Sequence, residues 1–378
     1  LFTDSLATGN DIGAEVLATG GGGGLFFADF QNSSFYRNTG SGLLLDSQNY
    51  EESIARFNNG NVSDNAVGLE FLQSGNLLAM SLVSGAQADN NIIGLQTIQM
   101  GNLFGLVNIS DSEANANGAF GIQNVQYSQI ASVGIIGMPA GLMDSANALA
   151  SLFSLTLPEE VGMFLSPAGP ITANGNGVFG VQSVVQTDSG LALGGLFSIA
   201  ANGNGADGVQ SIVTVDSGLA LGALFDITAN GNGADGINAV NNANHGVAIG
   251  VAGSTANLAE IVELGTEVAS LFGLDLPLAI TSQGHMEANG NSGVGFRMTT
   301  TGSNAAVNAV VGLDTLGNSD AGTFLGTYSD NLSIAALARL YTAENVGAGL
   351  LFDMLGRQTG AVGVLADVFA DVNGDSGI

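Results

Sequence analysis

The residues of this chain best suited to bind a metal ion are acidic and amide side chains at recurring turn sequences. Near the C-terminus, Asp371, Asn373 and Asp375 alternate as ligands do at the start of a calcium loop, although no distal Glu follows. Asp207 and Asp235 occupy equivalent places in two copies of the sequence GNGADG. Because calcium prefers carboxylate and amide oxygens, these five residues are the candidate calcium ligands. Turn formation without a metal is the competing interpretation.

The two GNGADG sequences belong to a repeat of 28 residues. Residues 171–198 and 199–226 align without gaps and match at 20 of 28 positions, and a third copy starts at Ile227. A fixed period of this size is the signature of a solenoid, in which each repeat packs mainly on its neighbours.

A looser pattern, an Asn followed three or four residues later by a Gly, extends through the whole chain. The pairs that define the predicted turns are Asn176/Gly180, Asn204/Gly208, Asn232/Gly236, Asn291/Gly295, Asn318/Gly322 and Asn345/Gly349, with further pairs Asn10/Gly13, Asn38/Gly42, Asn65/Gly68, Asn91/Gly94, Asn117/Gly121 and Asn373/Gly377. Successive glycines are 26–29 residues apart except for two intervals of 59, each close to two coils, which gives thirteen steps. Asn tolerates left-handed backbone angles and Gly adopts them freely, so each pair predicts a turn. Stacked Asn amides can then hydrogen-bond to one another as a ladder.

Between these turns lie short apolar segments bounded by Gly, Asn and Asp, which is typical of strands. One coil of about three strands cannot bury its apolar face alone, whereas coils stacked about 4.8 Å apart can. We therefore predict an all-β fold in which residues 1–378 form a single right-handed parallel β-helix. Thirteen steps would give a rod of about 60 Å.

The two 59-residue intervals depart from the regular pattern. They share NALASLFSLTLP (147–158) and TEVASLFGLDLP (266–277), and they hold all five prolines, which hydrogen-bonded strands exclude. In the second interval apolar residues fall mostly at helical spacing. We predict that each interval is a coil with a helix-bearing excursion, near 134–170 and 247–284, packed on the flank of the rod. A degenerate coil is the alternative.

The Asn-Gly lines of the repeat, such as ITANGNGADGI at 227–237, resemble those of the pectin-lyase-like superfamily of right-handed β-helices. That superfamily includes polysaccharide lyases, glycosidases, phage tailspikes, autotransporter passengers and adhesins, so the resemblance implies the fold and no single activity. Its lyases use Lys or Arg as a base beside acidic calcium ligands. Here Lys is absent, and the nearest set is Arg297 with Glu287 and His285. We therefore predict that the protein is not an enzyme and keep a polysaccharide lyase or glycosidase as an alternative.

The sequence around Asp207 also resembles the calcium-binding nonapeptide of repeats-in-toxin proteins. In that family calcium lies between tandem nine-residue turns, whereas the period here is 28, so the neighbouring half-site is missing. The resemblance therefore favours turn formation over calcium at Asp207 and Asp235, and the only cofactor we retain as an alternative is calcium.

The strong excess of acidic over basic residues limits the kinds of molecule that the protein could bind. The chain has 33 acidic residues against five Arg and no Lys, a formal net charge of −28. Such a charge repels phosphate backbones and anionic lipid headgroups, so we predict no nucleic-acid partner. No apolar run approaches the roughly 20 residues that span a bilayer. The absence of Cys excludes a disulfide framework.

The repeat continues to both ends of the sequence, where 1–16 and 368–378 have similar spacing. Uncapped end coils expose unpaired backbone and apolar core, and head-to-tail contacts that do not close into a ring produce fibres. We therefore predict a secreted structural protein, the subunit of an extracellular filament, sheath or surface fibre that assembles with copies of itself. The alternative is an adhesin or passenger domain of a larger surface protein, with a polysaccharide or a cell surface as its partner.

Overall fold

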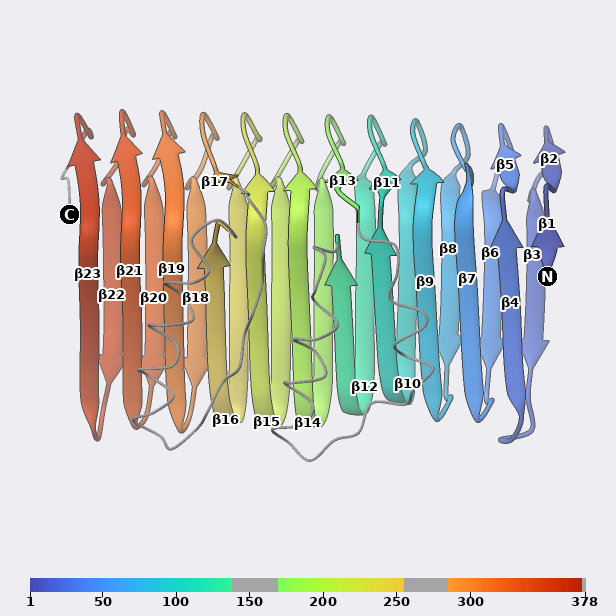
Figure 1. Ribbon diagram of the computed structural model, residues 1–378, viewed down its shortest axis with the longest axis horizontal. Coiled ribbons are helices and arrows are strands. Elements are labelled where there is room, and N and C mark those ends of the chain that lie inside the picture. The colour runs from blue at the N-terminus through green and yellow to red at the C-terminus, as the bar shows by residue number, and fades with distance from the viewer. Residues whose placement is uncertain (138–168, 255–284, 376–378) are drawn as a thin grey trace.

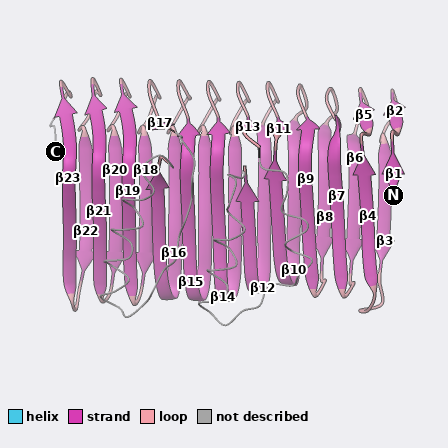
Figure 2. Ribbon diagram, viewed as in Figure 1, coloured by secondary structure: helices cyan, strands magenta, loops and turns pink. Residues whose placement is uncertain are grey.

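The computed structural model describes residues 1–137, 169–254 and 285–375, and these form one parallel β-solenoid. The coils follow one another in sequence order along a single axis, and the two termini lie at opposite ends of the rod (Figure 1). All strand pairings among the described residues are parallel. Figure 2 shows strands and loops in this part of the chain and no helix. The prediction of an all-β parallel solenoid is therefore confirmed.

The described residues contain twenty-three strands. These are β1 (Phe2–Thr3), β2 (Leu6–Thr8), β3 (Ala14–Thr19), β4 (Leu25–Gln31), β5 (Ser34–Tyr36), β6 (Ser41–Gln48), β7 (Glu52–Asn61), β8 (Val67–Ser74), β9 (Leu78–Gln87), β10 (Ile93–Ser110), β11 (Ser112–Glu113), β12 (Phe120–Ile136), β13 (Ile171–Thr172), β14 (Val181–Ala200), β15 (Val209–Thr228), β16 (Ile237–Gly253), β17 (Met286–Glu287), β18 (Phe296–Gly302), β19 (Ala305–Leu316), β20 (Thr323–Ser329), β21 (Leu332–Ala343), β22 (Leu350–Gly356) and β23 (Gly360–Asp371).

Strand β15 shows the plan of one coil. Its first arm, 209–215, reverses at Gly218 (φ +139°) into a second arm, 219–225. The chain then turns a corner at Asp226, which has φ +55°, and passes through a short third arm into the turn that holds Asn232. Val209 pairs with Val181 of β14 and with Ile237 of β16, so each coil is hydrogen-bonded to both neighbours. The first and second arms lie in two separate layers (Figure 1).

The interior is built from columns of residues that pair from coil to coil. The core column lies on the inner side of the second arm. Its members are Phe2, Phe30, Phe57, Val83, Ile109, Ile136, Leu196, Leu224, Ala252, Val310, Leu337 and Leu365. The ten members from Phe30 to Leu337 are buried, while Phe2 and Leu365 are each 45% exposed. The apolar core therefore reaches the surface at both ends of the rod.

The coil count predicted from the spacing is wrong. Asn117 hydrogen-bonds directly to Asn176, and Asn232 to Asn291, so each 59-residue interval is one step of the solenoid rather than two. The other steps span 26–28 residues, and eleven steps join Asn10 to Asn373. The described rod is therefore about 53 Å long at 4.8 Å per coil, not 60 Å.

The predicted excursions near 134–170 and 247–284 fall largely on 138–168 and 255–284, outside the described residues. Their bounds were too wide, because β12 continues to Ile136 and β16 to Gly253 as regular strand. The predicted helices and their packing on the flank concern residues that are not described, and they stay predictions. The described residues contain no helix that is long and apolar enough to span a membrane.

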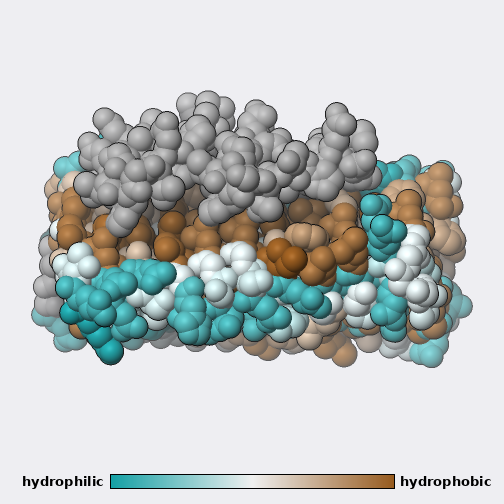
Figure 3. All heavy atoms as spheres, turned by 90° about the horizontal axis from the view of Figure 1, so that it is seen from below, coloured by the Kyte–Doolittle hydropathy of each residue, from teal (hydrophilic) through white to brown (hydrophobic). Residues whose placement is uncertain are grey.

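The second arms are apolar on both sides. Leu224 belongs to the interior cluster, whereas its neighbour Phe225 belongs to a separate cluster with Phe197, Ile135 and Val311. The rings of Phe197 and Phe225 stack with centroids 5.8 Å apart. Figure 3 shows an apolar band that runs along the rod beside a hydrophilic one. Strands buried on both faces read as continuous apolar runs, as LALGALF does here.

Candidate functional site

The predicted asparagine turns form an uninterrupted ladder along the rod, which we call the inner ladder. The backbone N–H of each member donates to the Oδ1 atom of the next, at 2.7–3.2 Å. The members between the two ends are all buried. The inner ladder consists of Asn10, Asn38, Asn65, Asn91, Asn117, Asn176, Asn204, Asn232, Asn291, Asn318, Asn345 and Asn373.

The predicted reason for the glycines of these turns needs correction. Neither Gly180 nor Asn204 has a positive φ; the left-handed residue is Gly203, at +64°, directly before the ladder Asn. A Cβ on Gly180 would lie 2.8 Å from Nδ2 of Asn204 and 2.6 Å from the Gly208 carbonyl oxygen. Glycine is therefore required here because the amide of the following coil needs the space.

The same close approach recurs at the other predicted turn glycines. A Cβ would meet the next ladder amide at 2.6 Å on Gly208, Gly236 and Gly295, and at 2.7 Å on Gly322. The carbonyl oxygen of Gly349 lies 2.7 Å from the Cβ position of Gly322, which places Gly349 in the same column.

A second ladder, the outer ladder, lies two residues before the inner one and runs in the opposite direction. From Asn115 onward, the backbone N–H of each member donates to the side-chain oxygen of the preceding member, at 2.7–2.9 Å, and the N–H of Leu316 donates to Asn289 in the same way. Sequence reasoning missed this ladder, although its signal, two Asn separated by one residue, is visible in each copy of the sequence NGN. The outer ladder consists of Asp89, Asn115, Asn174, Asn202, Asn230 and Asn289.

The carboxylates of Asp207 and Asp235 accept hydrogen bonds from residues of the following coil. Oδ1 of Asp207 accepts the Asp235 N–H and Oδ2 accepts Asn238 Nδ2, at 3.1 and 3.2 Å. Oδ1 of Asp235 accepts the Val294 N–H and Oδ2 accepts Nε of Arg297, at 2.8 and 2.7 Å. Burial raises the pKa of the Asp207 carboxyl, and its hydrogen bonds oppose that rise. All four oxygens therefore already have a protein donor.

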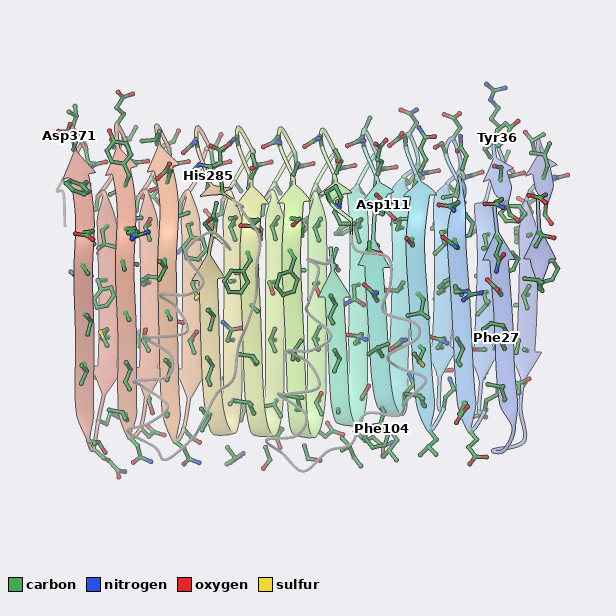
Figure 4. The ribbon with its side chains drawn as sticks, viewed as in Figure 1. Phe27, Tyr36, Phe104, Asp111, His285 and Asp371 are labelled. Carbon is green, nitrogen blue, oxygen red and sulfur yellow. The ribbon has the colours of Figure 1, made fainter. Side chains whose placement is uncertain are left out.

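Of the three candidate ligands near the C-terminus, one is already engaged in the inner ladder and the other two are exposed. Oδ1 of Asn373 accepts two hydrogen bonds from Asn345 and is the end of the inner ladder. Asp371 and Asp375 lie on the exposed end coil (Figure 4 labels Asp371). Within 1–137, 169–254 and 285–375, no group of three or more His, Asp or Glu is arranged to hold a metal ion.

The residues considered for catalysis separate into two places. Nε2 of His285 lies 3.6 Å from Glu287 and 3.4 Å from Asp314, and burial raises the pKa of Asp314. Arg297 instead pairs with Asp235, and its guanidinium lies over the ring of Phe324 at 5.3 Å. The predicted combination of Arg297 with Glu287 and His285 is therefore not one site.

The largest uncovered apolar surfaces lie on the two end coils. At the N-terminal end the exposed fractions are 64% for Leu6, 60% for Leu25 and 44% for Phe27, which Figure 4 labels at that end of the rod. At the C-terminal end they are 51% for Val362 and 65% for Phe369. Among the described residues, β3 pairs only with β6 and β23 only with β21, so each end of the described rod also presents an unpaired strand edge.

The fold and these features define a parallel β-solenoid with two antiparallel amide ladders and two open ends. No protein-family model, no curated protein and no solved structure matches the chain.

Proposed function

We propose that this protein is a structural subunit of an extracellular filament, sheath or surface fibre, and that its copies stack end to end. The observation that carries the proposal is that the core column and the strand edges are open at both ends of the rod. An unpaired edge is a template for another strand, and an exposed core gains from burial.

Apolar side chains at the end surfaces favour association. Fully burying one large apolar side chain contributes about 1.5–3 kcal/mol. The five end side chains named above are 44–65% exposed, so together they would contribute roughly 4–8 kcal/mol, which overlaps the lower part of the association cost of about 4–15 kcal/mol. The net charge of −28 opposes the approach of two copies, so assembly should increase as salt screens the charge.

The extracellular location is part of the proposal. It is supported by composition, because a chain with five Arg and no Lys offers few sites to proteases that cut after basic residues. An exposed fibre benefits from that resistance.

Sedimentation and negative-stain imaging of the purified protein, in low and raised salt, test the proposal. We expect rods whose lengths are multiples of about 58 Å, because each copy adds twelve coil heights of about 4.8 Å, and longer rods in raised salt. Leu6→Asp or Phe369→Asp should keep the protein monomeric. Ile92→Asp is the matched control, because Ile92 is 59% exposed and lies away from the ends. Compact monomers under all conditions would overturn the proposal.

A further inference from the structure

We infer that two copies join in one direction and one register, with Phe2–Asn10 of one copy lying on Leu365–Asn373 of the copy before it. The inference rests on the proposed end-to-end assembly and adds the identity of the two faces that meet.

The direction follows from the inner ladder. Every backbone N–H in it donates toward the C-terminal end of the rod, so its two ends are chemically different. Oδ1 of Asn10 accepts no hydrogen bond from the described residues, and the N–H of Asn373 has no acceptor among them. Stacking Asn373 on Asn10 continues the ladder by one bond. A head-to-head joint would instead oppose two acceptors or two donors, and it would also reverse the strand direction.

The register follows from the spacing between the core column and the ladder. Phe2 precedes Asn10 by as many residues as Leu365 precedes Asn373. The corners also coincide, because Asp4 and Asp367, each two residues after the core member, have φ of +49° and +50°. The two segments therefore present the same backbone shape, as successive coils within the chain do.

The side chains that meet in this register are apolar and matched in exposure. Phe2 would cover Leu365, and both are 45% exposed. Leu6 would lie beside Phe369, with exposed fractions of 64% and 65%. Phe2 already stacks on Phe30 with ring centroids 4.7 Å apart, so placing Leu365 against Phe2 would continue the apolar core column across the joint.

In this register the contact between two copies does not include strand β3. The chain enters β3 only after Asn10, so β3 of the second copy would lie two coil heights from β22 of the first, about 9.6 Å away. The competing register places β3 directly on β22. Following the paired residues through the coils, that register would set Leu17 beside Asp353.

Disulfide trapping separates these arrangements, because the chain has no Cys of its own. The L6C and F369C proteins are mixed in equal amounts and oxidised in raised salt. Residues facing each other on adjacent coils, about 4.8 Å apart, are within the Cα separation of a disulfide, about 4.4–6.8 Å. We expect loss of the monomer band on a non-reducing gel in this mixture and its persistence for either protein alone. The L6C/F369C double variant should give covalent multimers. The L17C and D353C mixture is the matched control and should stay monomeric.

Sedimentation of the same samples distinguishes the two ways of failing. Trapping of L17C with D353C in assembled protein would overturn the register and leave end-to-end assembly standing. Trapping of L6C with itself would overturn the direction. Samples that sediment only as monomers would overturn the proposed function and this inference together.

Discussion

Replacing Asn204 by Ala tests how much one member of the inner ladder stabilises its coil. Asn204 is 2% exposed, and its Oδ1 accepts both the backbone N–H and the side-chain Nδ2 of Asn176, at 2.9 and 3.0 Å. Asn204→Ala leaves these two buried donors without an acceptor. Each unpaired buried donor costs about 1–3 kcal/mol, so the coil should lose about 2–6 kcal/mol of local stability.

Asn202→Ala in the outer ladder is the matched control, two residues away in the same turn. Asn202 is half-buried, and its Oδ1 accepts a single backbone N–H, that of Asn230, at 2.8 Å. Water can replace that acceptor, so the expected loss is about 0.5–1.5 kcal/mol.

Amide hydrogen exchange is the suitable assay, because long repeat arrays do not unfold in one step and local opening is what the substitution changes. A loss of about 2 kcal/mol should speed exchange at Asn176 by about 30-fold. The amides several coils away should keep their rates. Equal effects of the two substitutions, or an acceleration spread evenly along the rod, would refute the argument from burial.

Three further predictions follow from the same turns. Gly180→Ala should cost about 1–3 kcal/mol of local stability, measured by amide hydrogen exchange in its coil, because its Cβ overlaps the ladder amide of the next coil. Gly175→Ala, with open space but φ +65°, should cost about 1–2 kcal/mol by the same measurement. Asp207 has a folded pKa above its ordinary value of 3.8, so its contribution to stability is full below that value and is lost as pH rises through the folded pKa. Asp207→Asn should therefore flatten the pH dependence of the melting temperature over this range. Calcium should leave the melting temperature unchanged, because the side-chain oxygens of Asp207 and Asp235 and Oδ1 of Asn373 already accept protein hydrogen bonds; a rise saturating with calcium would contradict that reasoning.

The solenoid and its turn column could be predicted from sequence because a turn needs particular residues at a fixed period. The number of coils could not. An interval of 59 residues is close to twice 28, and the pairing of β12 with β14 and the bond between Asn117 and Asn176 show that the chain makes one step there. The role of Gly180 also could not be predicted. The sequence alone does not show whether a glycine is needed for a positive φ or because a Cβ would not fit.

The candidate site residues also could not be grouped correctly from the sequence. Arg297 and His285 are twelve residues apart in sequence, yet Arg297 pairs with Asp235 and His285 with Glu287 and Asp314. In a solenoid the neighbours of a side chain belong to the coils above and below, so closeness in sequence predicts contact poorly. The second apolar face, which holds Phe225, was hidden because a continuous apolar run does not distinguish a strand covered on one side from a strand covered on both.

Whether rods join depends on how the buried end surface compares with charge repulsion, and that repulsion is local. The Debye length is about 8 Å at physiological salt, less than two coils of about 4.8 Å, so most of the −28 charge lies too far from a joint to act. Asp371→Asn removes an exposed charge from the C-terminal end coil, and Asp216→Asn removes one from β15 near the middle of the rod. We expect Asp371→Asn to lower the salt concentration at which half of the protein sediments as assemblies and Asp216→Asn to leave it unchanged. An equal shift in both variants would mean that total charge, rather than charge at the joint, controls assembly.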